Sequence, residues 1–366
     1  MKKIFSILSC LCLLSMTACS LKQNGVTGSQ SAAADSAKNA KQDPKIESLQ
    51  LTGNRILSLE KGLSAAVFEG DDGFEAFLEQ GGAASDAEVL AFLKAYFLTG
   101  TSGLDFQVRG CGCSSLSVAN ENGDGYYFGR NFDWNRCEAL ILVSSPRKGY
   151  RSISTVNTDF IKQAAHIPLP DSVLKTAALY APLDGMNEKG LCASVNMIQD
   201  HATIKQQTGK AGLTTTTVIR LLLNQAATVD EALALLESYD VHASFGYMVH
   251  FAIADAAGNA VDVEYIDGQM SVIPTPILTN FYLTEGEKYG IGTAQSHTRF
   301  AILEERREQF PAMTSQEVCD SLSAVSKGNF GEFESTEWSV VFDQKNCTAV
   351  YFHRENYEKG YRIGLE

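Results

Sequence analysis

The chain has 366 residues and carries 43 acidic against 30 basic side chains, a formal net charge of −13 at pH 7. This balance disfavours nucleic acid as a partner, because binding to phosphate backbones relies on clustered lysine and arginine. An apolar fraction of 45% argues against general disorder and indicates a sizeable core. The length fits one large domain with additional segments.

The first 19 residues are typical of an export signal. Two lysines follow Met1, and an uncharged apolar run then ends in Thr-Ala-Cys at Cys19. The run is too short for a comfortable membrane span, and small residues before a cysteine are typical of a lipobox, in which Cys19 is lipidated. We therefore expect an exported lipoprotein, anchored to the membrane at the bacterial cell surface or in the periplasm. Residues 20–45, rich in Ser, Ala, Gln, Asn and Lys, predict a flexible tether.

Residues 46–112 have a helical pattern. Apolar residues recur at steps of three and four from Phe74 to Leu78 and again from Val89 to Phe97, which predicts two helices or more. Asp86 precedes the second run and is a candidate N-cap.

The pattern changes to strands after Cys113 and stays mixed to the end of the chain. A Gly-Asp-Gly turn at 123–125 predicts a hairpin between strands at 114–120 and 126–129. Further strands are predicted at 139–144, 191–197, 248–255, 260–266, 272–274, 338–343 and 348–353, and helices at 215–226, 229–238 and 298–307. Because strands and helices do not alternate regularly, a doubly wound parallel sheet is disfavoured, and two antiparallel sheets with outer helices satisfy the pattern.

Nine cysteines are present, of which two fall in the signal and Cys19 is the expected anchor. The remaining six are Cys111, Cys113, Cys137, Cys192, Cys319 and Cys347. No Cys-x-x-Cys spacing and no paired histidines accompany them, so the sequence predicts no zinc site.

Cys113 is the strongest candidate for a nucleophile. The predicted hairpin returns Arg130 and Asp133 beside it. A nearby guanidinium favours the thiolate, which is the attacking species, and so lowers the thiol pKa. By residue type alone, a buried cysteine beside a structural Arg-Asp pair is the more common arrangement.

Several sequence blocks resemble one known family. Cys-Ser-Ser at 113–115 and Gly-Arg-Asn-x-Asp at 129–133 are similar to the N-terminal-nucleophile hydrolases that include choloylglycine hydrolases, penicillin V acylases and N-acylethanolamine acid amidases. Blocks at 184–196, 263–280, 296–300 and 336–351 resemble later segments of that family, in the same order. Together they span about 240 residues.

The resemblance implies an α+β class protein, a four-layer αββα sandwich over 113–366 with the N-terminal nucleophile hydrolase fold. The segment 46–112 would then be a helical propeptide. The nucleophile has to become N-terminal, so the chain is expected to cut itself between Gly112 and Cys113. The freed α-amine, with an ordinary pKa near about 8, can then accept the thiol proton.

Roles for five more residues follow from the same resemblance. Arg130 would stabilise the thiolate, and Asp133 would orient the α-amine. Asn196 and Asn280 would donate hydrogen bonds to the oxyanion. Arg299 would brace the network. The expected reaction is hydrolysis of a linear amide C–N bond in a small molecule with an apolar acyl group, through a thioester acyl-enzyme that needs no metal and no cofactor.

Alternatives remain at this stage. Cys111, two residues earlier, competes as nucleophile, and a papain-like pair would need one of six scattered histidines, of which His297 is nearest a motif. The same acyl-enzyme serves an acyltransferase, and a surface lipoprotein could keep the fold only to bind a ligand. Cleavage would release the catalytic part from the lipid unless the preceding segment stays bound. The oligomeric state is open, a homo-oligomer included.

Overall fold

The computed structural model describes residues 43–53, 55–97, 112–165, 169–330 and 334–365, which belong to one compact unit. The predicted export signal, Cys19, almost all of the tether and Cys111 lie outside these residues. Among the helices that are described, none combines the length and the apolar character needed to cross a membrane.

The first sheet holds the predicted hairpin. In spatial order its strands are β1 (Lys45–Ser48), β19 (Lys359–Gly364), β18 (Thr348–His353), β17 (Ser335–Asp343), β5 (Tyr126–Trp134), β4 (Gly112–Asn120) and β15 (Ile277–Leu278), with β16 (Ala312–Met313) also paired to β4. Its central pairs are antiparallel, and β4 and β5 are adjacent as the turn at 123–125 predicts.

The second sheet is also mainly antiparallel. In spatial order it contains β14 (Gln269–Pro274), β13 (Ala260–Ile266), β12 (Val249–Ala254), β9 (Cys192–Met197), β8 (Asp184–Asn187), β7 (Ser152–Asn157), β6 (Ala139–Pro146), β3 (Leu63–Gly70) and β2 (Leu57–Glu60). Two short parallel strands, β10 (Gly212–Thr214) and β11 (Asp240–His242), form a separate small sheet.

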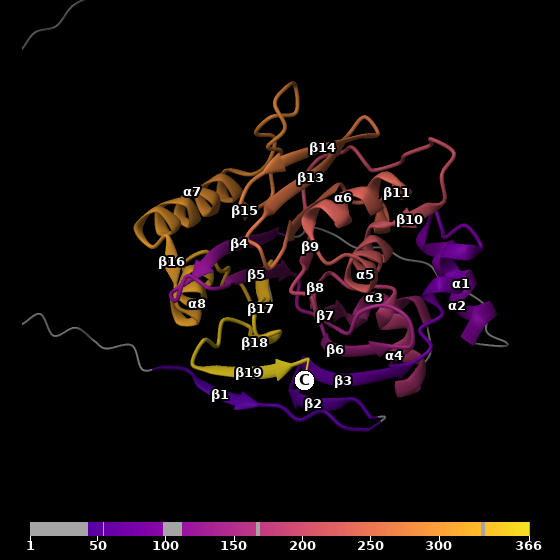
Figure 1. Cartoon of the computed structure of the whole chain (residues 1–366), viewed down its shortest axis with the longest axis horizontal. Coiled ribbons are helices and arrows are strands. Elements are labelled where there is room, and N and C mark those ends of the chain that lie inside the picture. The colour runs from indigo at the N-terminus through magenta and orange to yellow at the C-terminus, as the bar shows by residue number, and fades with distance from the viewer. Residues whose placement is uncertain (1–42, 54, 98–111, 166–168, 331–333, 366) are drawn as a thin grey trace, which may run out of the picture. The chain divides into compact units, whose positions relative to one another are not determined.

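Helices cover the outer faces of the two sheets (Figure 1). On the first sheet, α7 (Ala294–Gln309) contacts β4, and α8 (Ser315–Ala324) contacts β5 and β17. On the second, α4 (Asp171–Leu179), α5 (Thr215–Gln225) and α6 (Val229–Glu237) contact its strands, and α3 (Thr158–Ala165) packs on α4. Because β4 contacts β9 between the sheets, the order of layers is helix, sheet, sheet, helix. This confirms the predicted four-layer αββα sandwich.

The expectation that residues 46–112 are helical is only partly correct. The two predicted helices are present as α1 (Phe74–Glu79) and α2 (Asp86–Phe97), but three strands precede them. β3 pairs with β6 in parallel along its whole length, where indigo and magenta strands run side by side in Figure 1. β1 pairs with β19 in parallel at the edge of the other sheet. The segment before Cys113 therefore belongs to both sheets.

The helices of this segment are also packed into the remainder of the protein. The rings of Phe74, Phe77 and Phe92 surround Tyr180, with centroid distances of 5.7, 5.5 and 5.9 Å. The Tyr180 hydroxyl donates to the carbonyl of Asp72 at 2.8 Å. Burial of such aromatic groups is a major source of stability, so α1 and α2 are held firmly against α4.

Candidate active site

Cys113 lies at the start of β4, between the two sheets. Its side chain is buried, and its Cα is paired with that of Phe132 on β5. The backbone N–H of Cys113 donates to Asn280 Oδ1 at 2.7 Å. The atom that would become the α-amine after cleavage is thus already held by a side chain.

Arg130 reaches the thiol from β5. Its Nη2 lies 3.4 Å from Cys113 Sγ and also donates to the Val195 carbonyl at 2.7 Å. Its Nε donates to Asp184 Oδ2 at 2.9 Å, and its Nη1 donates to Asn196 Oδ1 at 2.6 Å. Burial alone would lower the pKa of Arg130, but the negative charges of Cys113 and Asp184 outweigh it and raise the pKa. The guanidinium is therefore a permanent, fully buried cation beside the sulfur.

Arg299 lies on the other side of Cys113 and comes from α7. Its Nη1 donates to the Cys113 carbonyl at 2.5 Å and to Ser114 Oγ at 2.6 Å. Its Nη2 donates to Asn280 Oδ1 at 2.6 Å. One arginine thus fixes both the backbone of Cys113 and the amide that holds its nitrogen.

The two predicted oxyanion donors have different surroundings. Asn196 Nδ2 donates to the carbonyls of Thr279 at 3.2 Å and Leu278 at 3.5 Å, while its Oδ1 accepts from Arg130. Asn280 Nδ2 donates to the Met197 carbonyl at 2.6 Å. An amide nitrogen carries two N–H groups, so Asn280 can offer its second one to a ligand, whereas Asn196 uses both on the backbone.

Asp133 faces the bond before Cys113. Its Oδ1 accepts from Thr336 Oγ1 at 2.7 Å, and its Oδ2 lies 3.7 Å from Arg299 Nη1 and 3.9 Å from Lys327 Nζ. Within the described residues, Oδ2 has no hydrogen-bond partner. Burial raises the pKa of Asp133, although the two cations act in the opposite direction. A carboxyl group that binds a proton more readily than usual therefore lies at the expected cleavage site.

Gly112 fits this place because it has no side chain. A β-carbon there would collide with Lys327 Nζ and would lie 3.2 Å from Asp133 Oδ2. Lys327 in turn forms an ion pair with Glu334. Packing therefore favours glycine at position 112.

A buried charge cluster that the sequence did not predict supports the segment carrying Asn280. His250 lies opposite Asn196 in the β12/β9 pair, and its Nε2 contacts the Thr279 carbonyl at 3.1 Å. Its Nδ1 lies 3.1 Å from Asp262 Oδ2 and 3.6 Å from Glu264 Oε1. Burial acts to lower the pKa of His250, but these two carboxylates raise it to about 10. His250 is therefore an imidazolium that donates to the carbonyl next to Asn280.

The same three side chains are the group of metal-type ligands found among the described residues, with ligand atoms within 4.8 Å of one another. Burial raises the pKa of Asp262 to about 7. Burial also acts to raise the pKa of Glu264, but hydrogen bonds from His250 and from the backbone of Leu283 lower it to about 2. The imidazolium of His250 lies between the carboxyl groups of Asp262 and Glu264, and the three side chains form a hydrogen-bonded network in which their charges are balanced.

A small apolar cavity of about 40 Å³ adjoins Cys113. Aromatic and aliphatic side chains form most of its wall, with a few hydroxyl groups. The lining residues are Cys113, Phe132, Trp134, Phe160, Leu183, Val195, Met197, Thr215, Thr216, Ser244, Phe245, Tyr247 and Val249. The wall is suited to an apolar group bonded to the sulfur.

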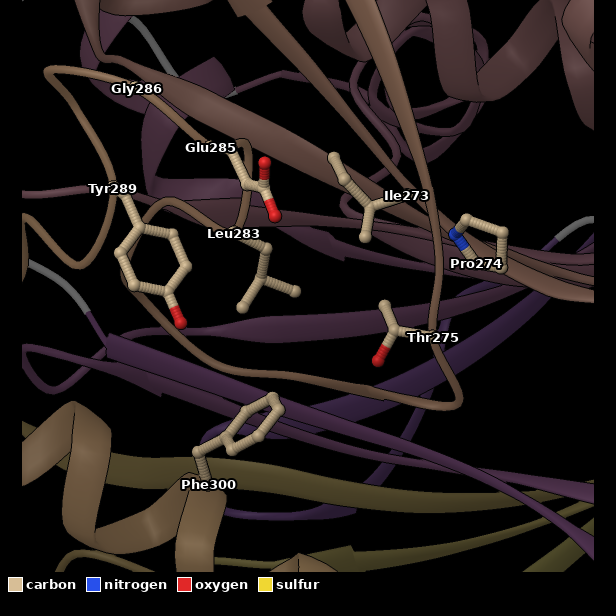
Figure 2. Close-up of a pocket in the computed structure, with 8 residues that line it drawn as sticks. All are labelled: Ile273, Pro274, Thr275, Leu283, Glu285, Gly286, Tyr289 and Phe300. Atoms are coloured by element: carbon tan, nitrogen blue, oxygen red, sulfur yellow. The ribbon is translucent and has the colours of Figure 1, made fainter.

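A larger and more open pocket of about 610 Å³ lies elsewhere (Figure 2). Side chains of β14 and the adjoining Thr275 face Leu283, Glu285 and Tyr289 across it, and Phe300 of α7 closes one side. Cys113 is not among its lining residues, so the larger of the two pockets is not the one beside the candidate nucleophile.

Residues 113–282 match the family model of the linear amide C–N hydrolases, choloylglycine hydrolase family. This part of the chain is similar to that family. The match begins at Cys113 itself, and the chain is a hydrolase that acts on linear amide C–N bonds. The predicted blocks at 296–300 and 336–351 lie beyond the matched residues, yet Arg299 of the first of them contacts Cys113.

Solved structures share the fold. Penicillin V acylase from Agrobacterium tumefaciens superposes with a TM-score of 0.52 at 20% identity, covering 69% of this chain and 86% of that one. A mutant and a variant of the conjugated bile acid hydrolase from Clostridium perfringens give TM-scores of 0.50 and 0.51 at 15% identity, each covering 69% of this chain and 92% of the other.

All six predicted site residues lie in one connected network around Cys113. Asp184, Trp338 and Lys327, which were not predicted from the sequence, contact that network from outside. Trp338 Nε1 and Arg130 Nε both donate to Asp184 Oδ2, at 2.9 Å each. Asp184 opens the block at 184–196 and Trp338 lies in the block at 336–351, so their places in these blocks were a usable signal, whereas Lys327 had none.

Proposed function

We propose that the chain is a lipoprotein precursor, anchored through Cys19, that cuts itself between Gly112 and Cys113 and then hydrolyses small-molecule amides through a thioester on Cys113. The observation that carries the proposal is the arrangement around one residue. Arg130 lies 3.4 Å from the sulfur, and Asn280 holds the nitrogen that cleavage would free.

In the mature enzyme the α-amine of Cys113 takes the thiol proton, and Arg130 stabilises the thiolate that results. The thiolate attacks the amide carbonyl, and the second N–H of Asn280 stabilises the oxyanion. The α-ammonium then gives its proton to the departing amine, which leaves a thioester on Cys113. Water attacks the thioester, a carboxylic acid departs, and the thiol is restored.

Self-cleavage needs another base, because the nitrogen of Cys113 is still an amide in the precursor. Asp133 is suited to accept the thiol proton, since its pKa is raised and its Oδ2 faces Gly112. The sulfur attacks the Gly112 carbonyl, Asp133 passes the proton to the Cys113 nitrogen as the C–N bond breaks, and water hydrolyses the resulting thioester. Lys327, packed against Gly112, supplies positive charge beside the developing oxyanion.

The cleaved protein remains a two-chain enzyme in this proposal. The upstream chain contributes β3 to one sheet and β1 to the other, and loss of either would expose a strand edge. The N-terminal chain would thus tether the catalytic part to the membrane of an exporting bacterium.

The apolar wall beside Cys113 supports an apolar acyl group as the part of the substrate that binds there. Penicillin V and conjugated bile acids, named for the similar structures, provide the first substrates to test. We expect the purified full chain to hydrolyse at least one apolar acyl amide. Cys113→Ala should remain uncut and inactive, while Cys347→Ala, a cysteine remote from the site, should behave like the parent. An active parent that stays uncut would refute the mechanism.

A further inference from the structure

The turn that follows β11 contains a strained residue at the wall of the Cys113 cavity. Phe245 has φ 56 and ψ 11, the left-handed conformation that bulky side chains rarely adopt. Its ring lines the cavity and packs on Phe160 with a centroid distance of 4.7 Å. Strain of this kind persists only where the surroundings enforce it, and it concentrates at functional sites.

The contact that holds Phe245 in this conformation comes from a residue that precedes the expected cleavage site in the sequence. The backbone N–H of Phe245 donates to Asp86 Oδ2 at 2.7 Å, and Asp86 is the first residue of α2. The neighbouring Ser244 N–H donates to Thr215 Oγ1 at 3.0 Å, so the turn is fixed from two directions. After cleavage the Asp86 contact would join two separate chains.

We infer that Asp86 is a specificity-determining positioning residue: through Phe245 it sets the width of the acyl pocket at Cys113. The inference rests on the proposed function, because it takes that cavity to receive the acyl group. At about 40 Å³ the cavity is narrow, and the Phe245 ring is part of its wall. Without the Asp86 acceptor, Phe245 relaxes toward an ordinary backbone conformation, its ring leaves the wall, and larger acyl groups gain access.

The first test compares hydrolysis of aminocoumarin amides of acetate, hexanoate, octanoate and phenoxyacetate by the full chain. Asp86→Ala should raise the ratio of octanoyl to acetyl kcat/KM at least about tenfold, a size typical of one altered pocket contact. Asp86→Asn keeps an acceptor oxygen and should keep the parental ratio. Glu88→Ala is the matched control, because Glu88 is also an acidic residue of the first turn of α2 but accepts from Ala84 instead.

A double-mutant cycle then shows whether Asp86 acts through Phe245. Phe245→Gly removes the ring and the strain together and should change the ratio as Asp86→Ala does. The double variant should add nothing further, because both changes affect one element. Additive effects would mean that Asp86 acts by another route and would overturn the inference.

A second readout does not depend on turnover. The rate at which iodoacetamide and a bulkier aryl iodoacetamide alkylate Cys113, followed by peptide mass mapping, reports the width of the cavity directly. Asp86→Ala should selectively speed the bulky reagent and hasten hydrogen exchange at the Phe245 amide. If the parent hydrolyses no amide but these changes occur, the proposed function fails and the role of Asp86 stands. If the parent is active and Asp86→Ala changes neither selectivity nor alkylation, the inference is wrong.

Discussion

The parts of the chain before and after the Gly112–Cys113 bond differ in structure and in how much of that structure their sequence predicts. Downstream, short motifs contain the six predicted site residues, and these residues meet around one sulfur. Upstream there is no catalytic motif, and the pattern indicates helices that could be discarded. The structure instead places upstream strands in both sheets, and the upstream carboxylate of Asp86 accepts a hydrogen bond from the backbone of Phe245, which lines the cavity beside Cys113. A segment that precedes the predicted nucleophile can therefore be part of the folded enzyme even when it contains no predicted site residue.

The largest expected effect is that of removing the upstream segment. A chain that starts at Cys113 after an initiator methionine lacks β3, whose Leu63, Ala65 and Ala66 are buried against β6. We expect it to be insoluble, because a long apolar strand edge is left exposed. Co-expression of a chain ending at Gly112 should rescue soluble, active protein. Soluble and active 113–366 on its own would show that the two sides are independent.

Next in size is the loss of the guanidinium beside the sulfur. Arg130→Lys keeps the charge but cannot contact the sulfur, Asp184, Asn196 and Val195 together. We expect kcat to fall about a hundred- to a thousandfold, comparable to the loss of one preorganised donor, with a smaller change in KM. Steady-state kinetics with the best amide substrate measures both. A change confined to KM would assign Arg130 to substrate binding instead.

A smaller effect is expected at the junction itself. Gly112→Ala introduces a β-carbon against Lys327, so the scissile bond should shift and self-cleavage should slow by about ten- to a hundredfold, because small misplacements cost this much. Lys327→Ala in the same chain makes room but removes the positive charge beside the oxyanion, so we expect it to restore little of the rate. Time-resolved gel analysis of the cut follows both. Unchanged cleavage in the single variant would remove steric fit as the reason for glycine at this position.

The smallest effect concerns stability and pH. His250 has its pKa raised from 6.5 to about 10, so its stabilising contribution is complete below pH 6.5 and is lost as the pH rises toward 10. Asp262 has its pKa raised to about 7, so ionisation of its carboxyl group lowers the stability of the folded state, with full effect above pH 7. His250→Gln should therefore cost about 1.5–3 kcal/mol at pH 6, the value of hydrogen bonds to a charged group, and less at pH 10. Urea unfolding at both pH values tests this, and an equal cost at both would contradict the charged state of His250.

The sequence predicts features whose signal is local. The β4/β5 hairpin follows from one Gly-Asp-Gly turn, and the helices around Phe74 and Val89 follow from apolar spacing. β3 escapes prediction because its residues show little alternation between buried and exposed positions, and its parallel partner β6 lies far along the chain.

The missed parts of the site have a similar cause. His250 reads as an isolated histidine in an apolar strand, and only strand register brings it to Asp262 and Glu264. Asp86 was predicted to be the N-cap of a helix, and this prediction is wrong. It lies within the first turn of α2, and its carboxylate accepts a hydrogen bond from the backbone of Phe245, a residue distant in sequence. Non-local contacts of this kind leave no pattern in a single sequence.

The central claim is that the chain cuts itself at Cys113 and that the upstream part stays as a working subunit. Mass spectrometry of the full chain, purified in detergent through a tag placed in the tether, tests it most directly. Under denaturing conditions we predict two polypeptides, one ending at Gly112 and one beginning at Cys113, and under native conditions a single species with their combined mass. An intact chain, or recovery of the tagged upstream piece without its partner, would contradict the account.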